Sequence, residues 1–83
     1  MTVLYFAWVR EKVGLSQETV APPASVTTVA GLVDWLAARG GGYAEAFKDR
    51  RLVRAAVDQV HSASHATIVG AKEVAFFPPV TGG

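Results

Sequence analysis

The chain has 83 residues, 51% of them apolar, which is enough for one compact domain with one core. A domain of this size has little volume in which to enclose a substrate pocket, so we expect function at a surface or a terminus. Eight basic residues against seven acidic ones give a formal charge of +1. That charge is too small for a protein that grips a nucleic-acid backbone, so no nucleic-acid partner is expected.

The chain contains no cysteine, which excludes disulfides, thiolate metal sites and a cysteine nucleophile. The apolar stretch Met1–Val9 is short and lacks the basic lead-in of a secretory signal. No other apolar run approaches the roughly 20 residues that span a bilayer. We therefore expect a cytoplasmic protein with no membrane contact.

The first two extended segments predict a hairpin. Val3–Val9 is rich in β-branched and aromatic residues, as a buried strand is. A charged connection that forms a helical turn and ends at Gly14 leads to a short second strand over Gln17–Val20. Pro22 then prevents further strand pairing.

One amphipathic helix follows the hairpin. Apolar residues recur at i, i+3, i+4 and i+7, namely Val29, Leu32, Val33 and Leu36. We expect Thr28 to be the N-cap, the helix to run over Val29–Arg39, and Gly40 to stop it. A further helical turn is predicted over Tyr43–Phe47.

The second half of the chain predicts strands. Leu52–Val57 is the third strand, a poor edge strand lies around Val60, and Lys72–Phe77 is the last strand. The two-residue period of the last strand places Phe77 on the face opposite to Phe76. The order of these strands and helices along the chain predicts an α+β fold. In it a mixed sheet packs on one main helix, the last strand is central, and the sheet face opposite to the helix is open.

The end of the chain, Pro78–Gly83, differs from the predicted domain over residues 1–77. Two prolines hold its base extended, and the terminal pair Gly82 and Gly83 has no side chains, which suits entry into a narrow channel. The only reactive group there is the α-carboxylate of Gly83. Two glycines alone are more typical of a frayed end than of a functional one.

Two segments resemble a known family. Glu73-Val-Ala-Phe-Phe-Pro-Pro-Val-Thr-Gly-Gly83 resembles the C-terminal signature of the small, sulfur-carrying subunits of molybdopterin synthase. The opening Val3–Gly14 and the segment Leu52–Gln59 are similar to the first and third strands of that family, although Asp58 and Ala71 stand where it usually has asparagine and glycine. The resemblance implies a ubiquitin-like β-grasp fold.

The resemblance also implies the chemistry. A partner adenylating enzyme, related to ubiquitin-activating enzymes, uses ATP and Mg to convert the Gly83 carboxylate into an acyl-adenylate. Sulfur then replaces AMP and gives a thiocarboxylate, which the large synthase subunit uses on cyclic pyranopterin monophosphate. By this reading the chain binds no cofactor or metal itself and has no turnover alone.

The partner interface is expected beside the tail. In a β-grasp sheet the first and last strands are neighbours, so Phe6 and Phe77 lie side by side if Phe6 is on the open face. They form a docking patch together with Pro78, Pro79, Val80 and Thr81 of the tail. The alternative is that loops of the domain cover both aromatic rings.

Two other groups of residues are less informative. His61 and His65 have a spacing that can bind metal on a helix, but neither helical residues nor a third ligand accompany them, so we expect surface residues. The basic cluster Lys48, Arg50, Arg51 and Arg54 is typical of a solvated face, and the alternative is that it steers an acidic partner.

Three rival functions remain open at this point. One is a sulfur carrier of another pathway, such as that of the thiamine thiazole, although the Phe-Phe-Pro-Pro base of the tail argues against it. Another is a ubiquitin-like modifier whose Gly83 forms an isopeptide with lysines of target proteins. The last is an interaction domain with an inert tail.

Overall fold

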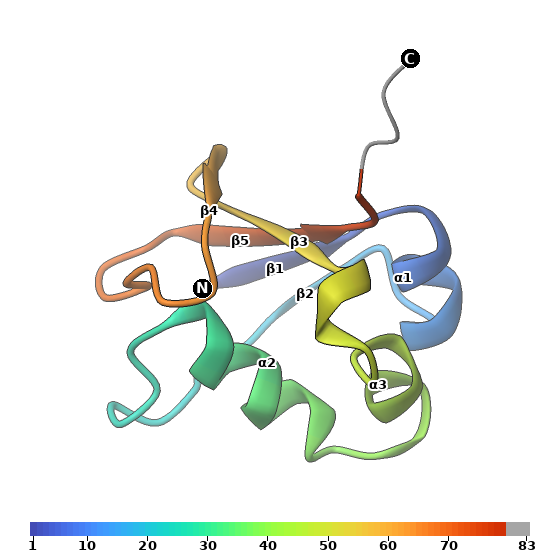
Figure 1. Cartoon of the computed structure of the whole chain (residues 1–83). Coiled ribbons are helices and arrows are strands. Elements are labelled where there is room, and N and C mark those ends of the chain that lie inside the picture. The colour runs from blue at the N-terminus through green and yellow to red at the C-terminus, as the bar shows by residue number, and fades with distance from the viewer. Residues whose placement is uncertain (80–83) are drawn as a thin grey trace.

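The computed structural model describes residues 1–79, which form a five-stranded mixed sheet with helices on one face (Figure 1). In chain order the elements are β1 (Thr2–Tyr5), α1 (Ala7–Val13), β2 (Gln17–Thr19), α2 (Val29–Ala37), α3 (Gly41–Ala46), the 3₁₀ helix η1 (Arg50–Leu52), β3 (Arg54–Val57), β4 (Val60–Ser62) and β5 (Glu73–Phe77). The strand order is β2-β1-β5-β3-β4, with β1 and β5 parallel and the other neighbours antiparallel. The predicted α+β, ubiquitin-like β-grasp fold with a central last strand is confirmed.

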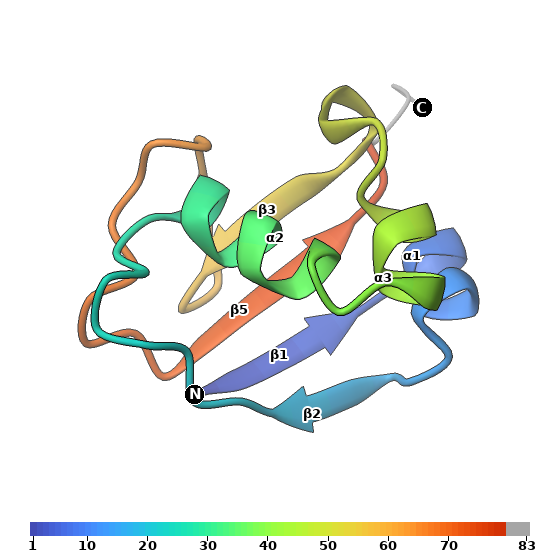
Figure 2. The ribbon, with the colours of Figure 1, turned by 90° about the horizontal axis from the view of Figure 1, so that it is seen from below.

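The core lies between the sheet and α2, which crosses one face of the sheet (Figure 2). The predicted helical stripe is buried, and so are the sheet residues that face it, namely Val3, Tyr5, Val74 and Phe76. Each fully buried apolar side chain contributes about 1.5–3 kcal/mol relative to an exposed one. Thr28 is the N-cap, as predicted, because its Oγ1 accepts a hydrogen bond from the Gly31 N–H at 3.1 Å.

The first strand is shorter than the sequence predicts, and the assignment of residues 7–9 to it was wrong. Tyr5 ends β1, and Phe6 is still extended with φ −126° and ψ 154°. Ala7 then has φ 52° and turns the chain into α1, which buries Val9. Residues 7–9 are apolar in either structure, so their composition cannot separate a strand from a buried helix.

The third strand also begins later than predicted. Residues 50–52 form η1 instead, whose N-cap Asp49 accepts a hydrogen bond from the Arg51 N–H at 3.1 Å. The predicted helical turn over residues 43–47 is α3, and the predicted edge strand is β4. No helix within residues 1–79 has the length and apolar character that crossing a membrane requires.

A two-residue turn joins β3 to β4. Asp58 and Gln59 both have positive φ, at 47° and 71°, as the type I′ turn of a tight hairpin requires at its two central residues. The Asp58 carboxylate also accepts hydrogen bonds from the backbone N–H groups of Lys72 and Glu73, at 2.9 and 3.0 Å. The turn is thereby tied to the start of β5.

Candidate functional site

The root of the predicted tail lies at the end of the central strand. Phe77 is the last residue of β5 and pairs in register with Arg54 of β3. Pro78 and Pro79 follow and are half-buried. Residues 80–83, which include Val80, Thr81, Gly82 and Gly83, lie outside the described residues. The tail and its chemical role therefore stay a prediction.

The sheet face opposite α2 carries an apolar row at its centre. The strand register places Leu4, Ala75, Ala56 and His61 next to one another in that order across four strands. Neighbouring side chains leave both alanines only 8% exposed. Leu4 and Ala75 of this row lie close to the last residues of β1 and β5.

Phe6 and Phe77 lie on this same face. Phe6 continues β1 in an extended conformation two residues after Leu4, and its N–H donates to the Phe76 carbonyl at 3.0 Å. Because Tyr5 pairs with Phe76, the next position places Phe6 beside Phe77. Phe6 is 48% exposed and Phe77 is half-buried. We call Leu4, Phe6, Ala56, His61, Ala75 and Phe77 the open-face patch.

The sequence prediction missed His61 as a member of this patch. Its ring lies 5.2 Å from the Phe77 ring, with an interplanar angle of 60°, and accounts for part of the cover over Phe77. The period of two within β4 could have indicated its face. His65 lies in the turn after β4, so the two histidines do not share a helical face.

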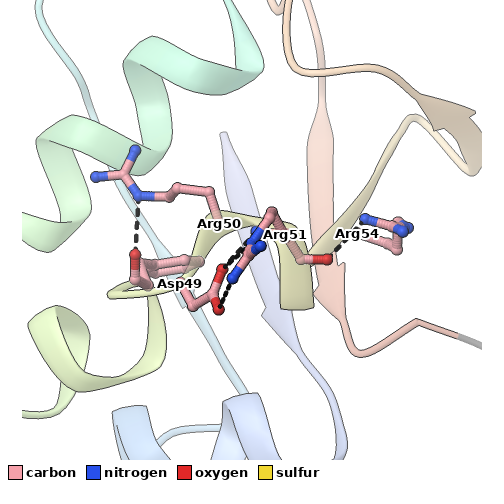
Figure 3. Close-up of polar contacts among 5 residues, drawn as sticks. Asp49, Arg50, Arg51 and Arg54 are labelled. Carbon is pink, nitrogen blue, oxygen red and sulfur yellow. Dashed lines mark hydrogen bonds and ion pairs between the residues drawn. The ribbon is translucent and has the colours of Figure 1, made fainter.

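The basic cluster is largely neutralised by carboxylates. Figure 3 shows the contact of Arg51 with Asp49. Arg50 pairs with Asp34 at 2.6 Å, and Arg51 pairs with Asp49 at 3.1 Å. Hydrogen bonds from Arg51 lower the pKa of the Asp49 carboxyl. Arg54 instead donates to the Arg51 carbonyl at 3.0 Å. Exposed ion pairs of this kind contribute little to stability, because water screens them, so the cluster is mainly a solvated face, as predicted.

Comparison with known proteins covers the whole chain. The sequence model of the ThiS family matches residues 3–83. The molybdopterin synthase sulfur carrier subunit of Escherichia coli (strain K12) is 44% identical over 81 residues, which cover 98% of this chain and 96% of that protein. The subunit of the same name from Haemophilus influenzae (strain ATCC 51907 / DSM 11121 / KW20 / Rd) is 31% identical over 83 residues, with 100% and 99% covered.

A solved structure agrees with the fold. The crystal structure of SAMP1 from Haloferax volcanii matches with a TM-score of 0.72 over 100% of this chain and 98% of that one. Its sequence identity is 24%, so it bears on the architecture alone.

Proposed function

Because the chain belongs to the ThiS family, we propose that it is the sulfur carrier subunit of a molybdopterin synthase. The observation that carries this proposal is the 44% identity to a protein of that name over 98% of the chain. The matched range of the family includes the Gly-Gly end, where the carrier chemistry would take place. We propose that the carrier acts in the cytoplasm, because its activating enzyme needs ATP.

The reacting group is the Gly83 carboxylate. A carboxylate is a poor acyl donor because its charge is delocalised and its leaving group would be oxide. Attack of a carboxylate oxygen on the α-phosphorus of Mg-ATP forms an acyl-adenylate and releases pyrophosphate. A sulfide-level donor then attacks the acyl carbon, a C–S bond forms, and AMP leaves with the former carboxylate oxygen.

The product is a Gly83 thiocarboxylate whose sulfur is largely ionised near neutral pH and is therefore a good nucleophile. This sulfur attacks a carbon of the pterin substrate, cyclic pyranopterin monophosphate, so that a C–S bond forms while a C–O bond of that carbon breaks and its oxygen leaves. Hydrolysis of the acyl–sulfur bond leaves the sulfur on the pterin and regenerates the carboxylate. Two such transfers build the dithiolene.

The chain supplies a nucleophile and a docking surface, and its partners supply the rest. The adenylating enzyme binds ATP and Mg, and the large synthase subunit binds and polarises the pterin. The open-face patch supports this division because it presents partly exposed aromatic rings beside the root of the tail. We propose that both partners dock on this patch and receive the tail in a narrow channel.

The names of the two relatives favour a role in molybdopterin synthesis over a role as a thiamine-type sulfur carrier. A ubiquitin-like modifier would use the same fold and the same end of the chain. The two roles differ in what becomes of Gly83, which gains sulfur in a carrier and forms an isopeptide in a modifier.

Intact-protein mass spectrometry tests the proposal. After incubation with the adenylating enzyme, ATP and sulfide, we expect a gain of about 16 Da, since one oxygen is replaced by sulfur. The gain should be absent without ATP. The modified protein should then support dithiolene formation by the large subunit. An unchanged mass, or a ladder of high-mass protein adducts in cell extract, would contradict the carrier function.

A further inference from the structure

Arg54 lies on the open sheet face, at the end of the sheet from which the tail begins. It pairs in register with Phe77, and side chains paired across antiparallel strands lie on the same face. Ala55, the next residue of β3, faces the core instead, as the two-residue period of a strand requires. Since Phe6 lies on the other side of Phe77, this end of the open face carries, in order, Phe6, Phe77 and Arg54.

Arg54 differs from the rest of the basic cluster, because Lys48, Arg50 and Arg51 each pair with a carboxylate. Within residues 1–79, no carboxylate forms an ion pair with Arg54, which is exposed. Its Nη1 donates one hydrogen bond, to the Arg51 carbonyl at 3.0 Å (Figure 3). A guanidinium has several N–H donors, so Arg54 keeps some of them for an anion outside the domain.

The charge of Arg54 is local to this end of the face. The acidic residue of β5 on the same face is Glu73, which pairs with Thr2 at the far end of the strand. Glu73 precedes Phe77 by four residues, so about 14 Å of strand separates it from the tail. A partner that covers the two phenylalanines therefore meets a positive charge beside them.

The pterin substrate is too remote to be the anion that Arg54 meets. In the proposed function the six residues 78–83 enter a channel, and six residues span at most about 20 Å. Gly83 carries the reacting group at the inner end of that channel, whereas Arg54 stays at its mouth. The anion opposite Arg54 therefore belongs to the surface of the partner.

We propose that Arg54 pairs with a carboxylate of the large synthase subunit, at the rim of the surface on which Phe6 and Phe77 dock. The inference rests on the proposed function, in which this chain is a subunit of the synthase and the large subunit is its lasting partner. It adds the chemistry of the partner surface, which has an apolar hollow for the two rings and an acidic residue beside the channel entrance. A charge at such a rim mainly speeds association and fixes orientation, while the buried rings supply affinity.

Charge reversal at Arg54, measured at two salt concentrations, tests the proposal. The full-length chain is mixed with the purified large subunit, calorimetry gives Kd, and stopped flow gives the association rate. At about 0.05 M salt, Arg54→Glu should bind at least about tenfold more weakly than the unsubstituted chain, because two carboxylates would face each other. At about 0.5 M salt the difference should fall below about threefold, since salt screens exposed charges. Most of the loss should appear in the association rate.

Lys48→Glu is the matched control. It changes the net charge by the same amount within the same basic cluster, but Lys48 follows α3, which lies on the helix side of the sheet in Figure 1. Its affinity should stay within about threefold of the unsubstituted chain at either salt concentration. Arg54→Lys, which keeps the charge, should also bind within about threefold.

Arg54→Gln removes the charge without reversing it, so its affinity should depend less on salt than that of the unsubstituted chain. Circular dichroism establishes that each variant is folded. If Arg54→Glu is not folded, the salt dependence of Arg54→Gln against the unsubstituted chain decides the matter.

Several outcomes would overturn the inference alone. Equal binding of Arg54→Glu and the unsubstituted chain at low salt would show that no carboxylate faces Arg54. An equal loss in Lys48→Glu would reduce the effect to net charge. An Arg54 Nε–H NMR signal that moves when residues 80–83 are removed, with no partner present, would identify the chain's own end as the anion. Failure of the unsubstituted chain to bind the large subunit would instead contradict the proposed function, and the inference with it.

Discussion

Glu18 of β2 is the residue at which three other side chains converge. Its carboxylate accepts hydrogen bonds from the hydroxyls of Tyr5 and Tyr43, at 2.8 and 2.6 Å, and from Arg39 Nη1 at 2.9 Å. The guanidinium of Arg39 also lies over the Trp35 ring, 4.7 Å from its centroid. One carboxylate therefore joins the edge strand β2 to β1, α3 and the end of α2.

Replacing Glu18 by alanine should destabilise the domain by about 2–3 kcal/mol, because it leaves the largely buried Tyr5 hydroxyl and Arg39 without their acceptor. Glu45→Ala is the matched control. Within residues 1–79, Glu45 pairs only with Lys48, and both side chains are more than half exposed, so its loss should cost less than about 1 kcal/mol. Urea unfolding measures both values. Equal effects of the two substitutions would contradict a structural role for Glu18.

The same network predicts a loss of stability in acid. Burial alone would raise the pKa of Glu18, but hydrogen bonds from Tyr43, Tyr5 and Arg39 outweigh it and hold that pKa below its ordinary value of 4.5. A carboxyl with a lowered folded-state pKa stabilises the fold above the unfolded value and loses this contribution as pH falls through the folded value. The stability difference between the unsubstituted chain and Glu18→Gln should therefore be constant above about pH 5.5 and shrink below pH 4.5. Unfolding measured from pH 7 to 3 checks this, and a difference independent of pH would count against it.

At the scale of elements, the contact between α1 and α3 depends on a missing side chain. A Cβ built on Gly42 would overlap the backbone carbonyl oxygen of Lys12, which is not free to move within α1. The close approach of these two short helices therefore requires glycine at this position.

Gly42→Ala should cost at least about 2 kcal/mol, because α1 and α3 would have to separate. Gly31→Ala in α2 is the control. Its Cβ would meet Thr28 Oγ1 at 3.3 Å, a slightly tight contact that the better helix propensity of alanine offsets, so the change should stay within about 1 kcal/mol. Thermal unfolding compares the two, and a stable Gly42→Ala variant would show that the helices can move apart freely.

Elements with a clear period and a local cap could be predicted from the sequence. The α2 stripe and the Thr28 cap are of this kind, since both depend on neighbours three or four residues away. The end of β1 could not be predicted, because it depends on Ala7 at φ 52°, a conformation for which an alanine side chain gives no signal. Tertiary contacts with β5 and α3 determine it instead.

In the candidate site, too, local patterns could be predicted from the sequence and tertiary contacts could not. The two-residue period and the fold placed Phe6 and Phe77 on one face, because strand geometry is local and the pairing follows from the topology. The ring contact of His61 with Phe77 joins residues 16 positions apart along the chain.

At the scale of the whole molecule, the two sheet faces have different roles. The face toward α2 holds the core, whereas the opposite face leaves Phe6 48% exposed within the open-face patch, where we propose that partners dock. Phe77→Ala should therefore weaken binding of the large subunit by about 2 kcal/mol or more, roughly 30-fold in Kd, without unfolding the domain. Val69→Ala is the control, because Val69 is 71% exposed but precedes β5 at the strand end remote from Phe77. Calorimetry measures both affinities. Normal binding by Phe77→Ala, or loss of its folded state, would contradict the docking role.

The last prediction separates folding from chemistry within one chain. In residues 1–79 the core ends at Phe76, so removing Gly83 should leave the unfolding free energy unchanged. The same deletion should abolish sulfur transfer, because the carboxylate would then belong to Gly82 and end one residue short of the activating site. Gly82→Val should impair transfer as well, since a β-branched side chain restricts the backbone and crowds a narrow channel. The assay is dithiolene formation by the large subunit, supplied with each variant after treatment with adenylating enzyme, ATP and sulfide. Undiminished product from the chain lacking Gly83 would place the sulfur elsewhere in the molecule and refute the carrier mechanism.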